Sequence, residues 1–319
     1  MANLASTVHA WLRAVSSTNG VRDMTAIEFK PLVDTLFLAG ESPVYDERGD
    51  ALWLCDIVRR ELHRIALASL EVQKWDFPSE VCSLGIAESG RLVIALRKEV
   101  GLFDPQSGDY RTLAEIEADN ADTRLNDGKV GPDGAFWVGT MDDADRPVKE
   151  PIAALYRVDA GGKVERKIDG LIISNGLAFS PDGTLMFHSD SRGPWIDRWR
   201  FDKATGAISE QKRLAVLDDE TGRPDGGATD AEGNYWSAGV SAARLNRFSS
   251  EGRLLESYPV PVAAPSMPCF GGPGLRRLFV TSLRNNRPKE LLDRYPLTGS
   301  VLVADAPVAG APVSRFRDV

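Results

Sequence analysis

The sequence has few cysteines, no long apolar run and little sustained helical periodicity. Its three cysteines, Cys55, Cys82 and Cys269, are an odd number and lie far apart in a chain of 319 residues. Such a set is a poor disulfide framework and fits a reducing compartment, so we expect a cytoplasmic protein. No apolar stretch approaches the ~18 residues that a membrane helix needs, and we therefore expect no membrane partner.

Positive charge is also scarce. The chain carries 38 Lys and Arg against 46 Asp and Glu, which gives a formal net charge of −8. A nucleic-acid binder needs a basic surface, so we expect no nucleic-acid partner. The same charge balance is compatible with a site that concentrates a cation.

The sequence lacks the signatures of several common catalytic sites. The three histidines, His9, His63 and His188, share no metal-ligand spacing, and none stands in a Ser or Cys triad context. This argues against a His-rich hydrolytic zinc site and against a catalytic triad. Neither a glycine-rich dinucleotide fingerprint nor a phosphate-binding loop is present.

The N-terminal segment has little that predicts a folded unit, and it lacks the continuous apolar region of a secretory signal. Four apolar residues have the spacing of one helix face, which predicts at most a short amphipathic helix over 7–16. The scarcity of acids before Asp23 weakly resembles a transit peptide; a frayed extension or a translation start at Met24 is the simpler interpretation. We predict an N-terminal extension over 1–24 and a single domain over 25–319.

What the chain does have is a repeat. Its copies are GESPVYDERGDALW (40–53), RLNDGKVGPDGAFWVGTM (124–141), SNGLAFSPDGTLMF (174–187) and PDGGATDAEGNYW (224–236). In each copy a polar residue stands eight positions before a turn glycine, and a bulky residue follows that glycine by three or four. The turn glycines are Gly49, Gly90, Gly134, Gly183, Gly233 and Gly274, at intervals of 41 to 50 residues.

This period predicts the fold. Short apolar or alternating runs broken by Gly, Pro, Asp and Asn are typical of many short strands, and one repeat of 40 to 50 residues matches one four-stranded propeller blade. Six units fill the chain, so we predict an all-β, six-bladed β-propeller rather than a tandem of β-sandwiches. The segment 29–39 precedes the first unit, and we expect it to pair near 300–308 and close the ring. The recurring tryptophans are interpreted as blade packing: Trp53, Trp137 and Trp236.

The repeat also locates a candidate site. The residues eight positions before the turn glycines are Glu41, Cys82, Asn126, Asn175, Asp225 and Ser266. If the repeats are blades, these residues begin the innermost strands and converge at one rim of the central channel. Two carboxylates and two amides among them suit a hard divalent cation. Asn or Asp before Gly is often only a turn former, but four at an equal offset favour a metal site, and Glu41 is not followed by Gly.

Neighbouring residues extend this site. Arg124 stands two positions before Asn126, so in an extended segment both side chains lie on the same face. We predict that Arg124 points into the same mouth; a rim arginine paired with a surface acid is the alternative. Asp142 and Asp143 either edge the opening or lie in a solvated loop. Cys82 is more readily a small buried hydrophobe than a reactive thiol.

These motifs resemble the SMP-30/gluconolactonase family. The segments that carry the resemblance are GESPVYDE, RLNDGKVGPDGAFWVGTM, SNGLAFSPDGTLMFHSDS and RPDGGATDAEGNYW, and the likeness covers about residues 36–290. The C-terminal part is most similar to bacterial sugar lactonases. The resemblance implies a six-bladed propeller with one divalent metal in the central channel.

The resemblance also implies roles for individual residues. The family's metal ligands fall on Glu41, Asn175 and Asp225, and its substrate-contacting arginine and asparagine fall on Arg124 and Asn126. A further substrate-binding glutamate follows the Gly-Thr-Met stretch in animal members. It is not reproduced here, and Asp142, Asp143 and Ala144 stand in its place.

The hypothesis from the sequence is metal-dependent hydrolysis of a sugar aldonolactone, of gluconolactone or pentonolactone type, to the aldonic acid. Asp225 is assigned as a metal ligand and general base, and the cation as one of Ca, Mn, Mg, Zn or Fe. The expected partner is a small sugar lactone, and the protein is expected to be a monomer or a weak homo-oligomer. Two alternatives remain open: a metal-dependent esterase or phosphotriesterase on the same scaffold, and a noncatalytic calcium-binding propeller.

Overall fold

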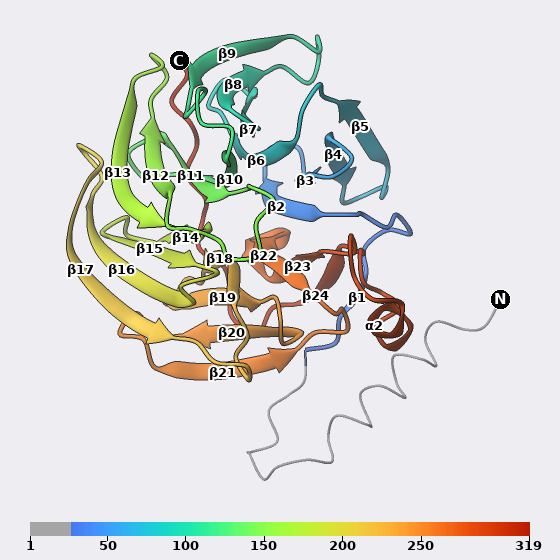
Figure 1. Ribbon diagram of the computed structural model, residues 1–319. Coiled ribbons are helices and arrows are strands. Elements are labelled where there is room, and N and C mark those ends of the chain that lie inside the picture. The colour runs from blue at the N-terminus through green and yellow to red at the C-terminus, as the bar shows by residue number, and fades with distance from the viewer. Residues whose placement is uncertain (1–26) are drawn as a thin grey trace.

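The computed structural model describes residues 27–319. Six four-stranded antiparallel sheets surround a central axis, and in each sheet the strands are neighbours in chain order except at the closure of the ring (Figure 1). This arrangement is the six-bladed β-propeller that the repeat predicts. The extension over 1–24 and the short helix predicted at 7–16 lie outside the described residues.

The blades are numbered in chain order. Blade 1 comprises β2 (Gly40–Asp46), β3 (Ala51–Asp56), β4 (Glu61–Ala66) and β5 (Val72–Asp76). Blade 2 comprises β6 (Val81–Ile86), β7 (Leu92–Leu96), β8 (Glu99–Phe103) and β9 (Tyr110–Glu115). Blade 3 comprises β10 (Thr123–Val130), β11 (Phe136–Asp142), β12 (Ala153–Val158) and β13 (Val164–Leu171).

The second half of the ring repeats the pattern. Blade 4 comprises β14 (Ser174–Phe179), β15 (Leu185–Asp190), β16 (Trp195–Asp202) and β17 (Ala207–Val216). Blade 5 comprises β18 (Pro224–Thr229), β19 (Tyr235–Gly239), β20 (Arg244–Phe248) and β21 (Leu254–Pro259). Blade 6 comprises β22 (Pro265–Gly271), β23 (Arg277–Ser282), β24 (Leu302–Asp305) and β1 (Lys30–Pro31). Within residues 27–319 the helices are the 3₁₀ turn η1 (Pro273–Leu275) and α2 (Lys289–Arg294).

Four of the six innermost strands are buried along their whole length, and β2 and β10 are buried except at a few half-buried positions. Every residue of β6, β14, β18 and β22 is buried, whereas most of the outermost strand β17 is exposed or half-buried. Because neighbouring blades cover both faces of an inner strand, its sequence is continuously apolar or small rather than alternating. The inner strands therefore give a firmly packed wall to the channel.

Strands from both ends of the chain close the ring. Lys30 of β1 pairs with Val303 of β24, so blade 6 is completed by the N-terminal segment, as the sequence predicts. The prediction of a strand over 29–39 is wrong in length, because the strand ends at Pro31. Proline has no N–H to continue a ladder. Beyond it the pairing is reduced to single bonds, such as the 2.8 Å bond from the Leu32 N–H to the Val301 carbonyl.

The repeated tryptophans hold the blades together, as predicted, and all three are buried. In blades 3 and 5 the indole N–H donates to an aspartate of the preceding turn, and an arginine of the third strand donates to the same carboxylate. The two sets are Trp137, Asp133 and Arg157, and Trp236, Asp230 and Arg247. Each set ties three successive parts of one blade to a single buried carboxylate.

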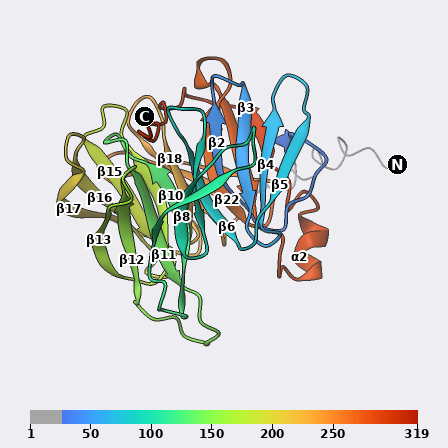
Figure 2. The same cartoon turned by 90° about the horizontal axis from the view of Figure 1, so that it is seen from above.

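The C-terminal strap, residues 309–318, crosses one mouth of the channel. Ala311 donates its N–H to the Thr229 carbonyl in blade 5, and Phe316 donates its N–H to the Ile86 carbonyl in blade 2. Blades 5 and 2 lie opposite each other in the ring, so the strap spans its diameter. Figure 2 shows the C-terminus and α2 on opposite faces of the ring. No helix within residues 27–319 is long and apolar enough to cross a membrane.

Candidate functional site

The six positions selected by the repeat all lie on innermost strands, which confirms their predicted equivalence. Five are the second residue of their strand, and Asn126 is the fourth residue of β10. In every blade the ladder to the next strand shifts register at or just after this position, for example between Glu41 and Val44 and between Asn175 and Ala178. A β-bulge re-aims the side chains beside it.

Four of the six side chains meet in one cavity. A cavity of about 260 Å³ at this mouth is lined by Glu41, Asn126, Asn175 and Asp225, together with Arg124. The other two positions do not line it. Ser266 is buried and donates from Oγ to the Gly40 carbonyl, at 2.6 Å.

Cys82, the remaining position, is a buried thiol beside the site. Burial raises the pKa of the Cys82 thiol to about 11, although Arg124 lowers it. Its Sγ lies 3.7 Å from Nη1 of Arg124. At neutral pH the group is a neutral thiol, in keeping with the structural role expected from the sequence, and Cys55 and Cys269 are likewise free and buried.

The two carboxylates of the cavity destabilise one another's charge. Burial raises the pKa of Glu41 well above its ordinary value, and the negative charges of Asp225 and Asp127 raise it further. Burial and then the charge of Asp127 raise the pKa of Asp225 to about 7. Three acids therefore crowd one buried region, which a bound cation would stabilise.

Asn175 is held in a fixed orientation between the strands of blades 4 and 5. Its Nδ2 donates to Oδ1 of Asp225 at 2.8 Å and to Oγ of Ser191 at 2.9 Å. Ser191 in turn donates to the Pro224 carbonyl at 2.6 Å. With both amide hydrogens directed at these partners, the carbonyl oxygen of Asn175 is the atom left for a ligand.

The donor set fits a hard divalent cation. Glu41 and Asp225 offer carboxylate oxygens and Asn175 offers an amide oxygen, the ligand types that such cations prefer. Oδ1 of Asp127, whose charge acts on Glu41 and Asp225, is buried without a hydrogen-bond partner in the described chain. Within residues 27–319 no three His, Cys, Asp or Glu side chains are placed so that they could hold a metal ion together, and the third donor of the predicted set is the Asn175 amide. The assignment of the three residues as ligands stays a prediction.

Arg124 and Asn126 lie side by side, as their spacing predicts. Nη1 of Arg124 donates to Oδ1 of Asn126 at 3.2 Å and to the Leu125 carbonyl at 2.8 Å, and its Nε lies 3.3 Å from Oδ1 of Asp143. Asn126 donates to the Ser174 carbonyl at 2.9 Å. Both alternatives raised for Arg124 therefore hold together: the side chain lines the cavity and also pairs with an acid at the rim.

Asp142 and Asp143 have different environments, and neither lines the cavity. Asp142 is fully buried and accepts hydrogen bonds from the Ala144 and Glu150 N–H groups, at 3.0 and 2.7 Å. It fastens the loop that follows β11 and does not edge the opening. Asp143 lies beside Arg124 at the rim.

Sequence reasoning missed three arginines of the cavity. Arg192, Arg223 and Arg287 line it together with the predicted residues. Burial, and then the positive charges of Arg192 and Arg287, lower the pKa of Arg223. Arg223 had a signal in the sequence, because it stands two residues before Asp225 as Arg124 stands before Asn126. Arg192 and Arg287 lie in loops after β15 and β23, where the repeat gives no information.

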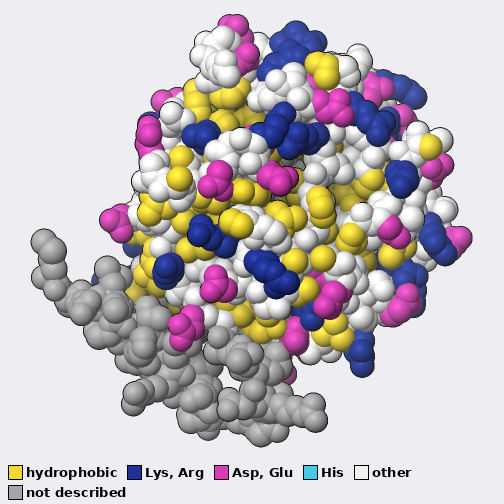
Figure 3. All heavy atoms as spheres, turned by 180° about the vertical axis from the view of Figure 1, so that it is seen from behind, with side chains coloured by type: hydrophobic (Ala, Val, Ile, Leu, Met, Phe, Trp, Pro, Cys, Tyr) yellow, Lys and Arg dark blue, Asp and Glu magenta, His cyan; other side chains and the backbone are white. Residues whose placement is uncertain are grey.

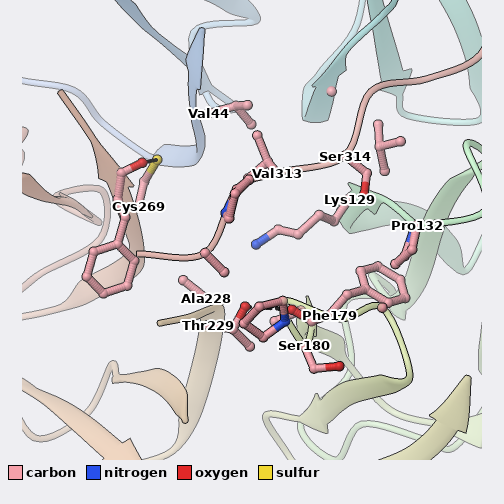
Figure 4. Close-up of a pocket in the computed structure, with 18 of the residues that line it drawn as sticks. Val44, Lys129, Pro132, Phe179, Ser180, Ala228, Thr229, Cys269, Val313 and Ser314 are labelled. Carbon is pink, nitrogen blue, oxygen red and sulfur yellow. Dashed lines mark hydrogen bonds between the residues drawn. The ribbon is translucent and has the colours of Figure 1, made fainter. Parts of the chain in front are cut away.

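The opposite mouth has a different character. A cavity of about 230 Å³ there is lined largely by apolar side chains and by the C-terminal strap. Figure 4 shows the Lys129 side chain reaching into it beside Val313, and its Nζ donates to the Gly227 carbonyl at 2.7 Å. Figure 3 shows the face on which the C-terminus lies, where basic, acidic and hydrophobic side chains are intermingled. The carboxylates and amides expected of a metal site are at the other mouth.

Fold and cavity together define the class: a six-bladed propeller with one polar site of carboxylates, amides and arginines at a channel mouth. Residues 39–284 match the SMP-30/Gluconolactonase/LRE-like region. The chain belongs to this family, which confirms the resemblance read from its motifs.

Individual relatives cover almost the whole chain. It is 35% identical over 277 residues to 6-deoxy-6-sulfogluconolactonase of Pseudomonas putida. This alignment covers 87% of this chain and 94% of that protein. It is 31% identical over 297 residues to regucalcin of Gallus gallus, covering 92% and 99%. The crystal structure of regucalcin from Agrobacterium tumefaciens, a calcium-binding protein, superposes with a TM-score of 0.86 at 29% identity, covering 92% of this chain and 98% of that chain.

The raised pKa of Asp225 predicts a pH effect on the metal-free protein. The folded-state pKa of about 7 lies above the unfolded value of roughly 3.9, so between them the folded state binds more protons. In chelator, the stability of wild type relative to Asp225→Asn should therefore fall as pH rises from about 4 to about 7. Burial lowers the pKa of His63 and His188, and these two groups make stability rise with pH. Their contribution is the same in wild type and in Asp225→Asn, so it cancels from the difference. Calorimetric melting at several pH values checks this, and a constant difference would contradict it.

Proposed function

We propose that the protein is a metal-dependent lactonase that hydrolyses a sugar aldonolactone, of gluconolactone or pentonolactone type. The observation that carries the proposal is the meeting of Glu41, Asn175 and Asp225 with Arg124 and Asn126 in one cavity. Membership of the gluconolactonase-type family and the similarity to a sulfogluconolactonase support a lactone as substrate. The cofactor proposed is a single divalent cation.

Asp225 is the proposed proton acceptor. A divalent cation held by Glu41, Asn175 and Asp225 would polarise an ester carbonyl and make water more acidic. Because Oδ1 of Asp225 accepts from Asn175, Oδ2 is the oxygen that takes the proton of the attacking water. A bond forms between that water and the carbonyl carbon, the ring C–O bond breaks, and the proton passes to the departing ring oxygen. The product is the aldonic acid.

Arg124 and Asn126 are the proposed substrate-binding residues. Their mutual hydrogen bond and the Asp143 carboxylate hold the guanidinium in place before substrate arrives. A preorganised donor of this kind stabilises negative charge that develops on a carbonyl oxygen, and it also binds sugar hydroxyls. Neither residue is proposed as a direct ligand of the cation.

Arg124→Ala should lower kcat/KM for the lactone by about tenfold to a hundredfold, mainly by raising KM, with the cation retained. The reason is the loss of charge-assisted hydrogen bonds to substrate. Steady-state kinetics and metal analysis of the purified variant check this. Arg97→Ala is the matched control, since Arg97 also pairs with Asp143, at 2.7 Å, but does not line the cavity. Loss of the cation from Arg124→Ala would contradict the assignment.

A substrate panel tests the proposed function. Protein stripped of metal is assayed in a pH-stat against neutral and charged sugar lactones, with each cation restored in turn. Turnover that depends on the added cation is expected. Full activity after verified removal of metal would contradict the metal dependence. Hydrolysis of aryl esters or phosphotriesters without lactones would favour the esterase or phosphotriesterase alternative.

A calcium-binding propeller without catalysis is the second candidate. It is supported by the similarity to regucalcins, one of which is described as a calcium-binding protein. This candidate predicts calcium binding in a calorimeter and no turnover of any lactone in the panel. Cation binding accompanied by lactone turnover separates the two functions.

A further inference from the structure

Three arginines share one side of the cavity without partners. Arg192, Arg223 and Arg287 come from three different loops, those after β15, before β18 and after β23, and all line the same space. Within residues 27–319 none of their guanidinium groups forms an ion pair, a hydrogen bond or a stacking contact with an aromatic ring. Nε of Arg287 is buried and has no hydrogen-bond partner. An unsatisfied buried donor of this kind is costly unless a ligand completes it.

Two other arginines of the described chain are paired. Arg124, in the same cavity, is paired with Asp143, and Arg247 of blade 5 has three carboxylate partners. The three unpaired arginines also act on one another, since the charges of Arg192 and Arg287 oppose that of Arg223. Like charges held together repel one another, and an anion bound between them would relieve this repulsion.

The charge of the lining points the same way. Four arginines and two carboxylates line the cavity, so the lining is positive even when both acids are ionised, although the whole chain carries −8. The positive charges of Arg223 and Arg287 act on Asp225. Within residues 27–319, however, neither Glu41 nor Asp225 forms an ion pair with an arginine of the lining, and two carboxylates offset only part of the charge of four arginines. A divalent cation at the ligand set increases the positive charge further.

We propose that the substrate carries a negatively charged group away from its lactone carbonyl, and that Arg192, Arg223 and Arg287 bind this group. A carboxylate, a phosphate or a sulfonate meets the requirement, since the planar guanidinium fork binds each of these in a bidentate manner. A neutral sugar hydroxyl does not, because it brings no negative charge to offset the positive surplus of the lining. This inference rests on the proposed lactonase function and names the substrate class of the same site.

The test compares charged and neutral lactones on the cation-loaded, full-length protein. The probes are D-glucono-1,5-lactone and analogues that carry a carboxylate, a phosphate or a sulfonate at carbon 6. At least one anionic analogue should exceed the neutral lactone in kcat/KM by tenfold or more. Its KM should rise with salt while that of the neutral lactone does not. Because every lactone gives a carboxylate product, this comparison separates a substrate charge from binding of the product.

Substitutions then assign the effect to residues. Arg192→Gln, Arg223→Gln and Arg287→Gln should each lower the ratio of anionic to neutral kcat/KM by roughly tenfold, the value of a lost charged hydrogen bond. Arg223→Lys keeps the charge without the fork and should give an intermediate ratio. Arg253→Gln is the matched control, because it removes the same charge from an exposed turn between β20 and β21. Far-UV circular dichroism verifies that each variant is folded.

The outcomes distinguish the two proposals. Equal or better turnover of neutral lactones than of every anionic analogue overturns the anion site and leaves the lactonase function intact. An unchanged ratio in all three glutamine variants does the same. Failure to hydrolyse any lactone, charged or neutral, overturns both.

Discussion

Replacing Asp225 with alanine is expected to lower kcat/KM by at least about a thousandfold and to remove the bound cation. The substitution deletes one of two carboxylate donors together with the proposed proton acceptor, and general-base catalysis alone contributes roughly a hundredfold to ten-thousandfold. The ring should stay folded, because the lost carboxylate is buried beside Glu41 and Asp127 and repels both. Pre-steady-state and steady-state kinetics, metal analysis and thermal melting measure the three effects.

Two further variants separate the functions of this residue. Asp225→Asn keeps the size and one oxygen donor but cannot accept a proton, so it should lose turnover while retaining weak cation binding. Glu41→Ala should lose both cation and turnover, since Glu41 is a proposed ligand only. Retention of more than a tenth of wild-type activity in Asp225→Ala would contradict both assigned roles.

Trp236→Ala is expected to have the largest effect on stability, about 3–5 kcal/mol less unfolding free energy. The indole is fully buried, lies parallel to Tyr258 at 5.5 Å and packs edge-on against Phe270 at 5.5 Å. Its removal leaves a cavity between blades 5 and 6 and takes a hydrogen bond from Asp230. Denaturant or thermal unfolding followed by tryptophan fluorescence and circular dichroism measures the loss.

Controls distinguish packing from hydrogen bonding in this network. Trp236→Phe restores most of the ring volume and should cost markedly less than the alanine variant. Val148→Ala removes an exposed side chain and should change stability by less than about 0.5 kcal/mol. Because Trp236 does not line the site cavity, kcat/KM at temperatures where the variant is folded should equal that of wild type. A stability loss equal to that of Val148→Ala would contradict the assigned packing role.

The fold was predictable because each blade of a propeller is one repeat, so the blades appear in the sequence as a regular period. Turn glycines at intervals of 41 to 50 residues give similar blades, and a fixed offset from each glycine gives an equivalent position on each inner strand. The first copy shows the limit of this device: Asp50, rather than Gly49, adopts the positive φ there, at 39°. The hairpin still forms, because its turn needs one residue with a positive φ and this residue need not be the glycine.

The parts that sequence reasoning missed depend on long-range packing. Arg192 and Arg287 reach the cavity from loops outside the repeat, so no offset locates them. Asp142 was placed near the opening or in solvent because it follows a strand end. In the structure its loop folds back and buries it, with Arg146 3.1 Å away as a counter-charge. The strap likewise has no periodic signal, since it pairs with blades far from it in the chain.

The strap determines which end of the molecule is available for attachment. It carries the C-terminus across the mouth opposite the cavity of Glu41 and Asp225, so the chain ends on the far face of the ring. Coupling to a resin, electrode or sensor chip through a C-terminal tag therefore leaves the site-bearing face toward the solution. The same attachment gives every molecule a common orientation, which favours this end for a flow reactor or for surface-based binding measurements.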